Sequence, residues 1–165
     1  MLPPDQPTPD EAANAAVPSA PRAERSVLLV DDEATLRSAL RRFFLRRGWR
    51  VCEAEDGEHA RALLLDGREI GGGFDAIITD IRMPRLSGIE LHELVSVADP
   101  SIGQRFIFSS GDTGDVAALA VLARNQCPVI PKPFDLPTLL SLAERVAPPH
   151  QHARDPGWTA SDPAT

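Results

Sequence analysis

Five polar residues of this 165-residue chain have side chains that can act on phosphate together. Each comes just after a short apolar run, and they are Asp31, Asp32, Asp80, Ser110 and Lys132. Clustered carboxylates repel one another unless a cation neutralises them, and Mg²⁺ accepts a few carboxylate oxygens as ligands. One carboxylate can instead attack phosphorus as a nucleophile, while an ammonium and a hydroxyl stabilise the phosphoryl oxygens. The set therefore predicts magnesium-dependent phosphoryl chemistry, provided that the fold brings its members together.

Strand and helix patterns alternate along the chain, and this alternation indicates how the fold brings the five residues together. Short apolar or β-branched runs predict five strands, over 26–30, 49–53, 74–79, 105–109 and 129–130. Apolar residues at helical spacing predict five helices, over 33–47, 57–66, 87–97, 115–124 and 136–146. Five β-α units in strict succession predict an α/β fold, a doubly wound parallel sheet with helices on both faces.

The predicted sheet places all five residues at one edge. Ligands of a doubly wound sheet bind at the carboxyl ends of its strands, where these residues fall. Asp80 follows the middle strand of the set, with the acid pair on one side and Ser110 and Lys132 on the other. We therefore expect Asp80 to be the nucleophile and Asp31 and Asp32 to hold the metal.

The two ends of the chain differ in composition from its middle. Residues 1–24 hold six of the sixteen prolines, and residues 148–165 hold four more. Segments this rich in proline and poor in large aliphatic side chains do not bury enough surface to fold. We predict a single domain over 25–147 between two disordered tails.

Composition also excludes several classes of protein. A net charge of −7 makes direct binding to nucleic acid unfavourable. The two cysteines form neither a metal-type pair nor a disulfide framework, which favours a cytoplasmic setting. The longest apolar run, Val116 to Ala123, is eight residues, too short to span a membrane.

Four short motifs, in order, resemble those of the receiver domain of two-component response regulators, and the resemblance covers the whole predicted domain. They are Asp31-Asp32-Glu33, Thr79-Asp80-Ile81-Arg82-Met83-Pro84, Ser110-Gly111 and Lys132-Pro133-Phe134. The resemblance implies a flavodoxin-like sheet with strand order 2-1-3-4-5. It also implies that Asp80 accepts a phosphoryl group from a phosphohistidine on a sensor histidine kinase or a histidine phosphotransfer protein.

The resemblance assigns a role to each site residue. Asp31, Asp32, Asp80 and the backbone carbonyl of Arg82 would bind Mg²⁺. Lys132 would contact the phosphoryl group through its ammonium. The switch hydroxyl would be that of Ser110, and the peptide bond between Lys132 and Pro133 would be cis.

Some residues near the site depart from the family's pattern or invite a hypothesis. Val129 stands where many receivers carry a tyrosine or phenylalanine, which puts an aromatic readout in doubt. Arg82 and Asp112 flank the phosphorylation site, and we hypothesise that they pair across its mouth and hinder the attacking water. On the basic helix over 33–47, Arg37 and Arg41 are candidates for docking an acidic partner.

Three functions stay open for a chain with these features. The first is a free-standing, single-domain response regulator, which the start at Met1 with its own tail favours. Such a regulator would signal by a change of conformation and catalyse no reaction but its own phosphorylation and dephosphorylation. The alternatives are a receiver module of a hybrid histidine kinase or phosphorelay and, less favoured, a small aspartyl-phosphate phosphatase. The sequence leaves open the downstream partner and whether phosphorylation drives homodimerisation.

We also expect both His59 and His92 to be exposed.

Overall fold

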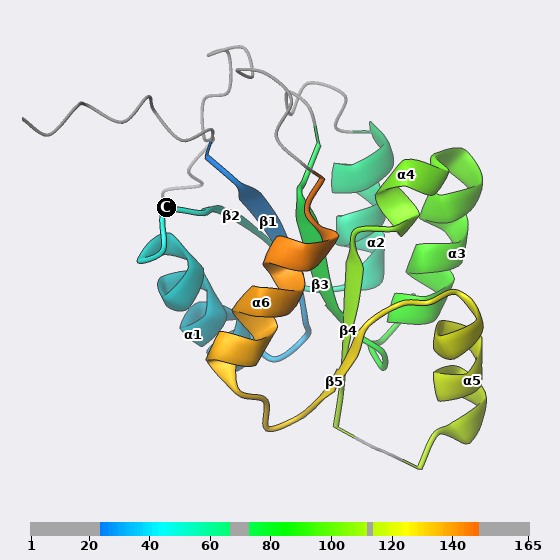
Figure 1. Cartoon of the computed structure of the whole chain (residues 1–165). Coiled ribbons are helices and arrows are strands. Elements are labelled where there is room, and N and C mark those ends of the chain that lie inside the picture. The colour runs from blue at the N-terminus through cyan, green and yellow to red at the C-terminus, as the bar shows by residue number, and fades with distance from the viewer. Residues whose placement is uncertain (1–23, 67–72, 112–113, 149–165) are drawn as a thin grey trace, which may run out of the picture.

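Five parallel strands form the centre of the molecule, and the computed structural model describes residues 24–66, 73–111 and 114–148. The strands are β1 (Ser26–Val30), β2 (Arg50–Ala54), β3 (Ala76–Asp80), β4 (Phe106–Ser110) and β5 (Val129–Pro131). They pair in the order β2-β1-β3-β4-β5, and every pair is parallel (Figure 1). The predicted fold class and strand order are confirmed.

Helices cover both faces of this sheet. They are α1 (Ala34–Leu45), α2 (Gly57–Arg61), the π-helical turn η2 (Ala62–Asp66), α3 (Gly88–Ala98), α4 (Pro100–Gly103), α5 (Val116–Arg124) and α6 (Leu136–Val146). Figure 1 shows α1 and α6 on one face and α2 to α5 on the other. No helix among the described residues is long and apolar enough to cross a bilayer.

The central strands are apolar on both sides because both of their faces are covered. Along β1, Val27 and Leu29 pack into the core under α1 and α6, whereas Leu28 and Val30 pack into the core under α2, α3 and α5. The period of two residues that sends neighbouring side chains to opposite faces thus fills two cores at once. All five residues of β1 and of β4 are buried.

Aspartate and serine side chains fix where most helices begin. Asp56, Asp99, Asp115 and Asp135 each accept a hydrogen bond from a backbone amide in the first turn of the helix that follows. Ser87 and Glu90 form a reciprocal capping box at the start of α3. These caps fix the connections that lead away from the strand ends and so position the site.

Three helical features differ from the prediction. The helix predicted over 33–47 is shorter, because Gly48 with φ +77° closes its last turn. The helix predicted over 57–66 is α-helical only to Arg61 and continues as η2. The short helix α4 was not predicted, although Asp99 followed by Pro100 is a typical helix start. Both predicted tails lie almost wholly outside the described residues, so the domain limits stay a prediction.

The expectation that His92 is exposed is wrong, because its side chain lies in the core with 7% exposure. Its ring meets Phe106 and Phe108 edge-on, with centroid distances of 5.1 and 5.7 Å. Nε2 lies 3.2 Å from the carbonyl oxygen of Gly103, and Nδ1 has no hydrogen-bond partner. Burial lowers the pKa of His92 below its ordinary 6.5, so the folded chain holds the ring neutral.

We predict that His92 makes the fold less stable in mild acid. Below about pH 6.5 the unfolded chain takes up a proton that the folded chain resists, so stability falls as the pH drops. Between about pH 7.5 and 5.5, wild type should lose about 1 kcal/mol of unfolding free energy more than the variant His92→Phe. Urea unfolding at both pH values measures this, with His59→Gln on the exposed side of α2 as control. Equal losses in wild type and His92→Phe would contradict the prediction.

Candidate functional site

Three carboxylates meet at the carboxyl edge of the sheet, at the bottom of the view in Figure 1. Asp31 and Asp32 directly follow β1, and Asp80 is the last residue of the neighbouring strand β3. One oxygen from each carboxylate lies within 4.8 Å of the others. Asp31 is buried, Asp80 is half-buried and Asp32 is exposed, so the cluster opens to solvent on one side.

Lys132 bridges two of these carboxylates from the end of β5. Its Nζ donates hydrogen bonds to Oδ2 of Asp31 at 2.8 Å and to Oδ2 of Asp80 at 3.0 Å. Burial alone would lower the pKa of Lys132, but the hydrogen bonds and the attraction from both carboxylates prevail and raise it above 10.5. The ammonium is therefore charged at any physiological pH and offsets part of the acidic cluster.

The strand beside Lys132 holds it in place and brings Ser110 to the same edge. Ser110 ends β4, is 7% exposed, and accepts a hydrogen bond on its carbonyl from the Lys132 backbone amide at 2.7 Å. The peptide bond between Lys132 and Pro133 is cis, as expected. Val129 lies on β5, opposite Phe108 of β4.

These residues fit a magnesium ion by the chemistry of their donors. Mg²⁺ binds through one or two carboxylates and several waters, often together with phosphate oxygens. Asp32 is exposed and has no hydrogen-bond or ion-pair partner among the residues that the structure describes. Because one ammonium cannot offset three carboxylates, an excess of negative charge remains for a divalent cation. The backbone carbonyl of Arg82 as a further ligand stays a prediction.

The loop between β3 and α3 packs closely against the end of β3. A Cβ on Gly88 would collide with the carbonyl oxygen of Asp80 and lie 3.0 Å from Oγ1 of Thr79. A Cβ on Gly57, at the start of α2, would likewise collide with the carbonyl oxygen of Leu86 in this loop. The absence of both side chains lets the loop follow Asp80 at van der Waals distance.

An arginine at each end of this loop contacts an acidic helix cap. Arg85, with φ +69°, pairs with the buried Asp56 that caps α2. Nη2 of Arg82 lies 3.2 Å from Oδ2 of Asp115, which caps α5. The sequence did not reveal either pair, because the partners are 29 and 33 residues apart and no local pattern links them.

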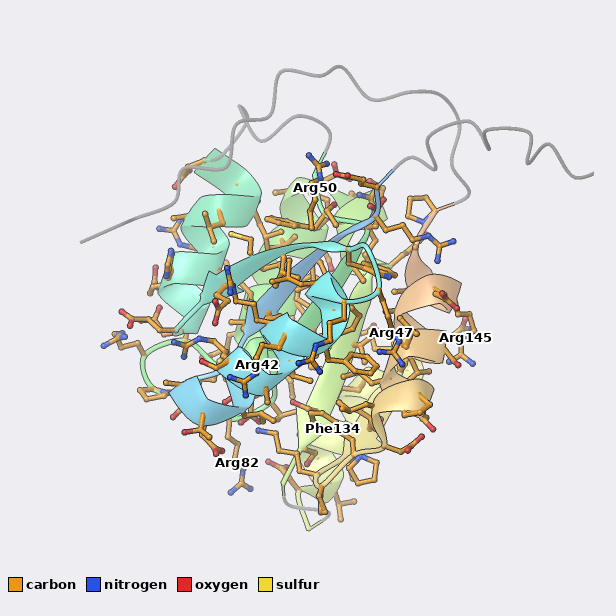
Figure 2. The ribbon with its side chains drawn as sticks, turned by 90° about the vertical axis from the view of Figure 1, so that its left-hand side faces the viewer. Arg42, Arg47, Arg50, Arg82, Phe134 and Arg145 are labelled. Carbon is orange, nitrogen blue, oxygen red and sulfur yellow. The ribbon has the colours of Figure 1, made fainter. Side chains whose placement is uncertain are left out.

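Two predictions about arginines stay untested. The pairing of Arg82 with Asp112 falls partly outside the described residues, since Asp112 is not among them. Arg37 and Arg41 lie 3.5 and 3.4 Å from Glu53 through their Nε atoms, and Arg37 also donates to the carbonyl of Asp31 at 2.7 Å. Both guanidinium groups thus have partners within the chain, and their docking role stays a prediction. Figure 2 shows Arg42 and Arg47 on the face that α1 presents to solvent.

The fold and the site together define the class of the protein. It is a doubly wound α/β protein with an acidic site at the carboxyl edge of its sheet. The family model of the response regulator receiver domain matches residues 27–144. The chain belongs to this family, whose members are phosphoacceptor switches tied to histidine kinases and generally bind Mg²⁺ through an acidic pocket.

Relatives and solved structures agree with this assignment. The sensor kinase CckA of Brucella abortus is 33% identical over 121 residues, 73% of this chain and 12% of the kinase. A response regulator receiver protein of Anaeromyxobacter is 35% identical over 119 residues, 72% of this chain and 47% of that protein. The chain thus spans less than half the length of either relative. A receiver protein structure from Pseudomonas putida matches with a TM-score of 0.65 at 31% identity, covering 75% of this chain and 98% of that one.

We predict that Gly88→Ala disturbs the site through the backbone of Asp80. The added methyl group collides with the Asp80 carbonyl oxygen, so strand or loop must shift at a cost of about 1–3 kcal/mol. Urea unfolding should show this loss, and calorimetric titration should show Mg²⁺ binding at least about threefold weaker, since about 0.7 kcal/mol is enough for that.

The matched control is Gly111→Ala, where a Cβ meets nothing within 4 Å. This variant should stay within about 0.5 kcal/mol of wild type. The interpretation would be wrong if both variants lost the same stability, or if Gly88→Ala bound Mg²⁺ as tightly as wild type.

Proposed function

We propose that this chain accepts a phosphoryl group on Asp80, in a magnesium-dependent reaction, from a phosphohistidine of a sensor histidine kinase or a histidine phosphotransfer protein. The observation that carries the proposal is the position of the Asp80 carboxylate. It receives a hydrogen bond from the Lys132 ammonium at 3.0 Å, and its oxygen lies within 4.8 Å of carboxylate oxygens of Asp31 and Asp32. A nucleophile, an ammonium and metal-binding groups thus share one open edge.

In the proposed transfer, the phosphoryl group moves from the donor imidazole to Asp80. A carboxylate oxygen of Asp80 forms a bond to phosphorus, and the bond from phosphorus to the imidazole nitrogen of the donor breaks. The electron pair of that bond stays on the leaving imidazole. Asp31, Asp32 and Asp80 would hold Mg²⁺, which would supply positive charge to the phosphoryl oxygens.

Lys132 and Ser110 act on the phosphoryl group after it arrives. The ammonium of Lys132 keeps its hydrogen bond to Asp31 and exchanges the Asp80 oxygen for a phosphoryl oxygen. Its positive charge therefore stays beside the negative charge that the phosphoryl group brings. Ser110 ends the strand next to β3 and contributes its hydroxyl to another phosphoryl oxygen. Movement of that hydroxyl toward the phosphoryl group is the proposed start of the conformational signal.

In this proposal the chain works as a single-domain regulator that switches state and turns over no separate substrate. The alternative of a receiver module within a hybrid kinase finds support in the sensor kinase of Brucella abortus, of which the matching segment is a small part. Asp80 would have the same chemistry in either setting. A cytoplasmic location, the downstream partner and phosphorylation-dependent dimerisation belong to the proposal as well.

The test is intact mass after incubation with Mg²⁺ and a small acyl phosphate. Wild type should gain one phosphoryl group, whereas Asp80→Asn should gain none, because an amide is not a nucleophile toward phosphorus. Removal of Mg²⁺ by a chelator should suppress the gain at least about tenfold, a barrier increase of about 1.4 kcal/mol.

Asp99→Asn is the matched control, since Asp99 is an exposed aspartate at the start of α4 and asparagine caps a helix equally well. It should be phosphorylated like wild type. Equal labelling of wild type and Asp80→Asn would contradict the proposal.

A further inference from the structure

The loop that follows Asp80 is fastened to two helices by two ion pairs of very different strength. Arg85 binds Asp56 at the start of α2, where the Arg85 side chain is 61% exposed but the Asp56 side chain only 6%. Arg82 binds Asp115 at the start of α5, where the two side chains are 63% and 31% exposed. Exposed ion pairs contribute little and rearrange easily, whereas breaking a buried pair is costly. Because both arginines are exposed, the two contacts differ in the carboxylate: Asp56 is buried and loses more without its partner, whereas Asp115 is partly in solvent and can give up its partner more easily.

Arg82 touches the acceptor and α5 at the same time. Its backbone amide donates to Oδ1 of Asp80 at 3.2 Å, while its guanidinium donates to Oδ2 of Asp115 at 3.2 Å. The other carboxylate oxygen of Asp115, Oδ1, accepts the Ala118 amide at 3.0 Å and caps the helix. Figure 2 shows Arg82 reaching out from the lower edge of the molecule, with its side chain largely in solvent.

We propose that Arg82 conveys the phosphorylation state of Asp80 to α5. In the unphosphorylated chain the guanidinium is bound to Asp115; a phosphoryl group on Asp80 draws the guanidinium to itself and releases Asp115. The N-terminal turn of α5 then loses its tie to the acceptor loop. This inference rests on the proposed function of Asp80 and adds a route by which that function leaves the site.

The charges at the site favour this exchange. Three carboxylates, the Lys132 ammonium and a divalent cation together are formally neutral. A phosphoryl group carries a charge of about −1.5 to −2, so when it replaces the single charge of Asp80 the site has an excess of about 0.5 to 1 negative charge. A guanidinium pairs with phosphate oxygens through two parallel hydrogen bonds, and such a pair is stronger than the exposed hydrogen bond that Arg82 donates to Asp115.

The start of α5 also carries an apolar side chain that would move with it when this tie breaks. Val116 directly follows Asp115 and is 73% exposed, one of the most exposed large apolar side chains among the described residues. The cap bond from Asp115 to Ala118 does not involve Arg82, so the helix itself persists. The expected change is a shift of the first turn of α5 together with an apolar surface residue, which a partner protein can recognise.

The test follows the Ala118 amide by nitrogen-15 NMR, with and without Mg²⁺ and the small acyl phosphate. Intact mass of the same samples reports whether Asp80 is phosphorylated. In wild type the Ala118 resonance should move on phosphorylation. In Arg82→Ala it should already lie near the phosphorylated position and move less than a third as far, at equal phosphorylation.

Two further variants separate the ion pair from general effects of charge. Asp115→Asn keeps a good helix cap but removes the charge that holds Arg82, so it should behave like Arg82→Ala. Arg124→Ala removes an exposed arginine from the far end of α5 and should behave like wild type.

Each outcome decides the matter. If Arg82→Ala is phosphorylated and its Ala118 resonance moves as far as in wild type, the signal reaches α5 by another route and the proposal is wrong. If Arg82→Ala no longer accepts the phosphoryl group while wild type does, Arg82 serves the transfer itself and the proposal is also wrong. A wild type that gains no phosphoryl group would overturn the proposed function instead, as the mass measurement shows separately.

Discussion

Asp31 and Asp80 lie close enough to repel each other because β1 and β3 are neighbours and end at the same edge of the sheet. The Lys132 ammonium makes this arrangement stable by bonding to both. Its position depends in turn on the pairing of β5 with β4, through the Lys132 amide and the Ser110 carbonyl. The strand order therefore also determines which charges meet. Lys132, after β5, supplies the positive charge that stabilises Asp31, after β1, and Asp80, at the end of β3.

The loop between β3 and α3 combines a rigid half with a movable one. Near its end, Gly88 packs directly against the Asp80 carbonyl, and Arg85 pairs with the buried Asp56. Near its start, the Arg82 side chain is mostly in solvent and has an exposed partner on another element. A closely packed backbone next to an exposed charged side chain suits the proposed switch, in which the ligand geometry stays constant while Arg82 changes its partner.

Local patterns in the sequence predict elements well and distant contacts poorly. Five β-branched runs alternate with helical spacing, which was enough to predict the parallel sheet and the edge where Asp80 and Lys132 meet. Arg85 and Asp56 are 29 residues apart, and nothing in either neighbourhood indicates the pair. The burial of His92 was missed for a related reason: its contacts with Phe106 arise only when α3 packs on β4. Periodicity records which face is buried, but not which polar side chains find partners there.

A chain with sixteen arginines and one lysine has an unusual chemical consequence. Reagents that acylate primary amines find one side chain to modify, Lys132, and that amine is protonated, largely shielded and bonded to two carboxylates. Acylation needs the neutral amine, so ordinary acylating reagents should react at the α-amine of the N-terminus and leave Lys132 of the folded chain almost unmodified. The same scarcity makes Lys132 a built-in reporter, since any treatment that frees its ammonium group from Asp31 and Asp80 would reveal itself as a newly reactive amine.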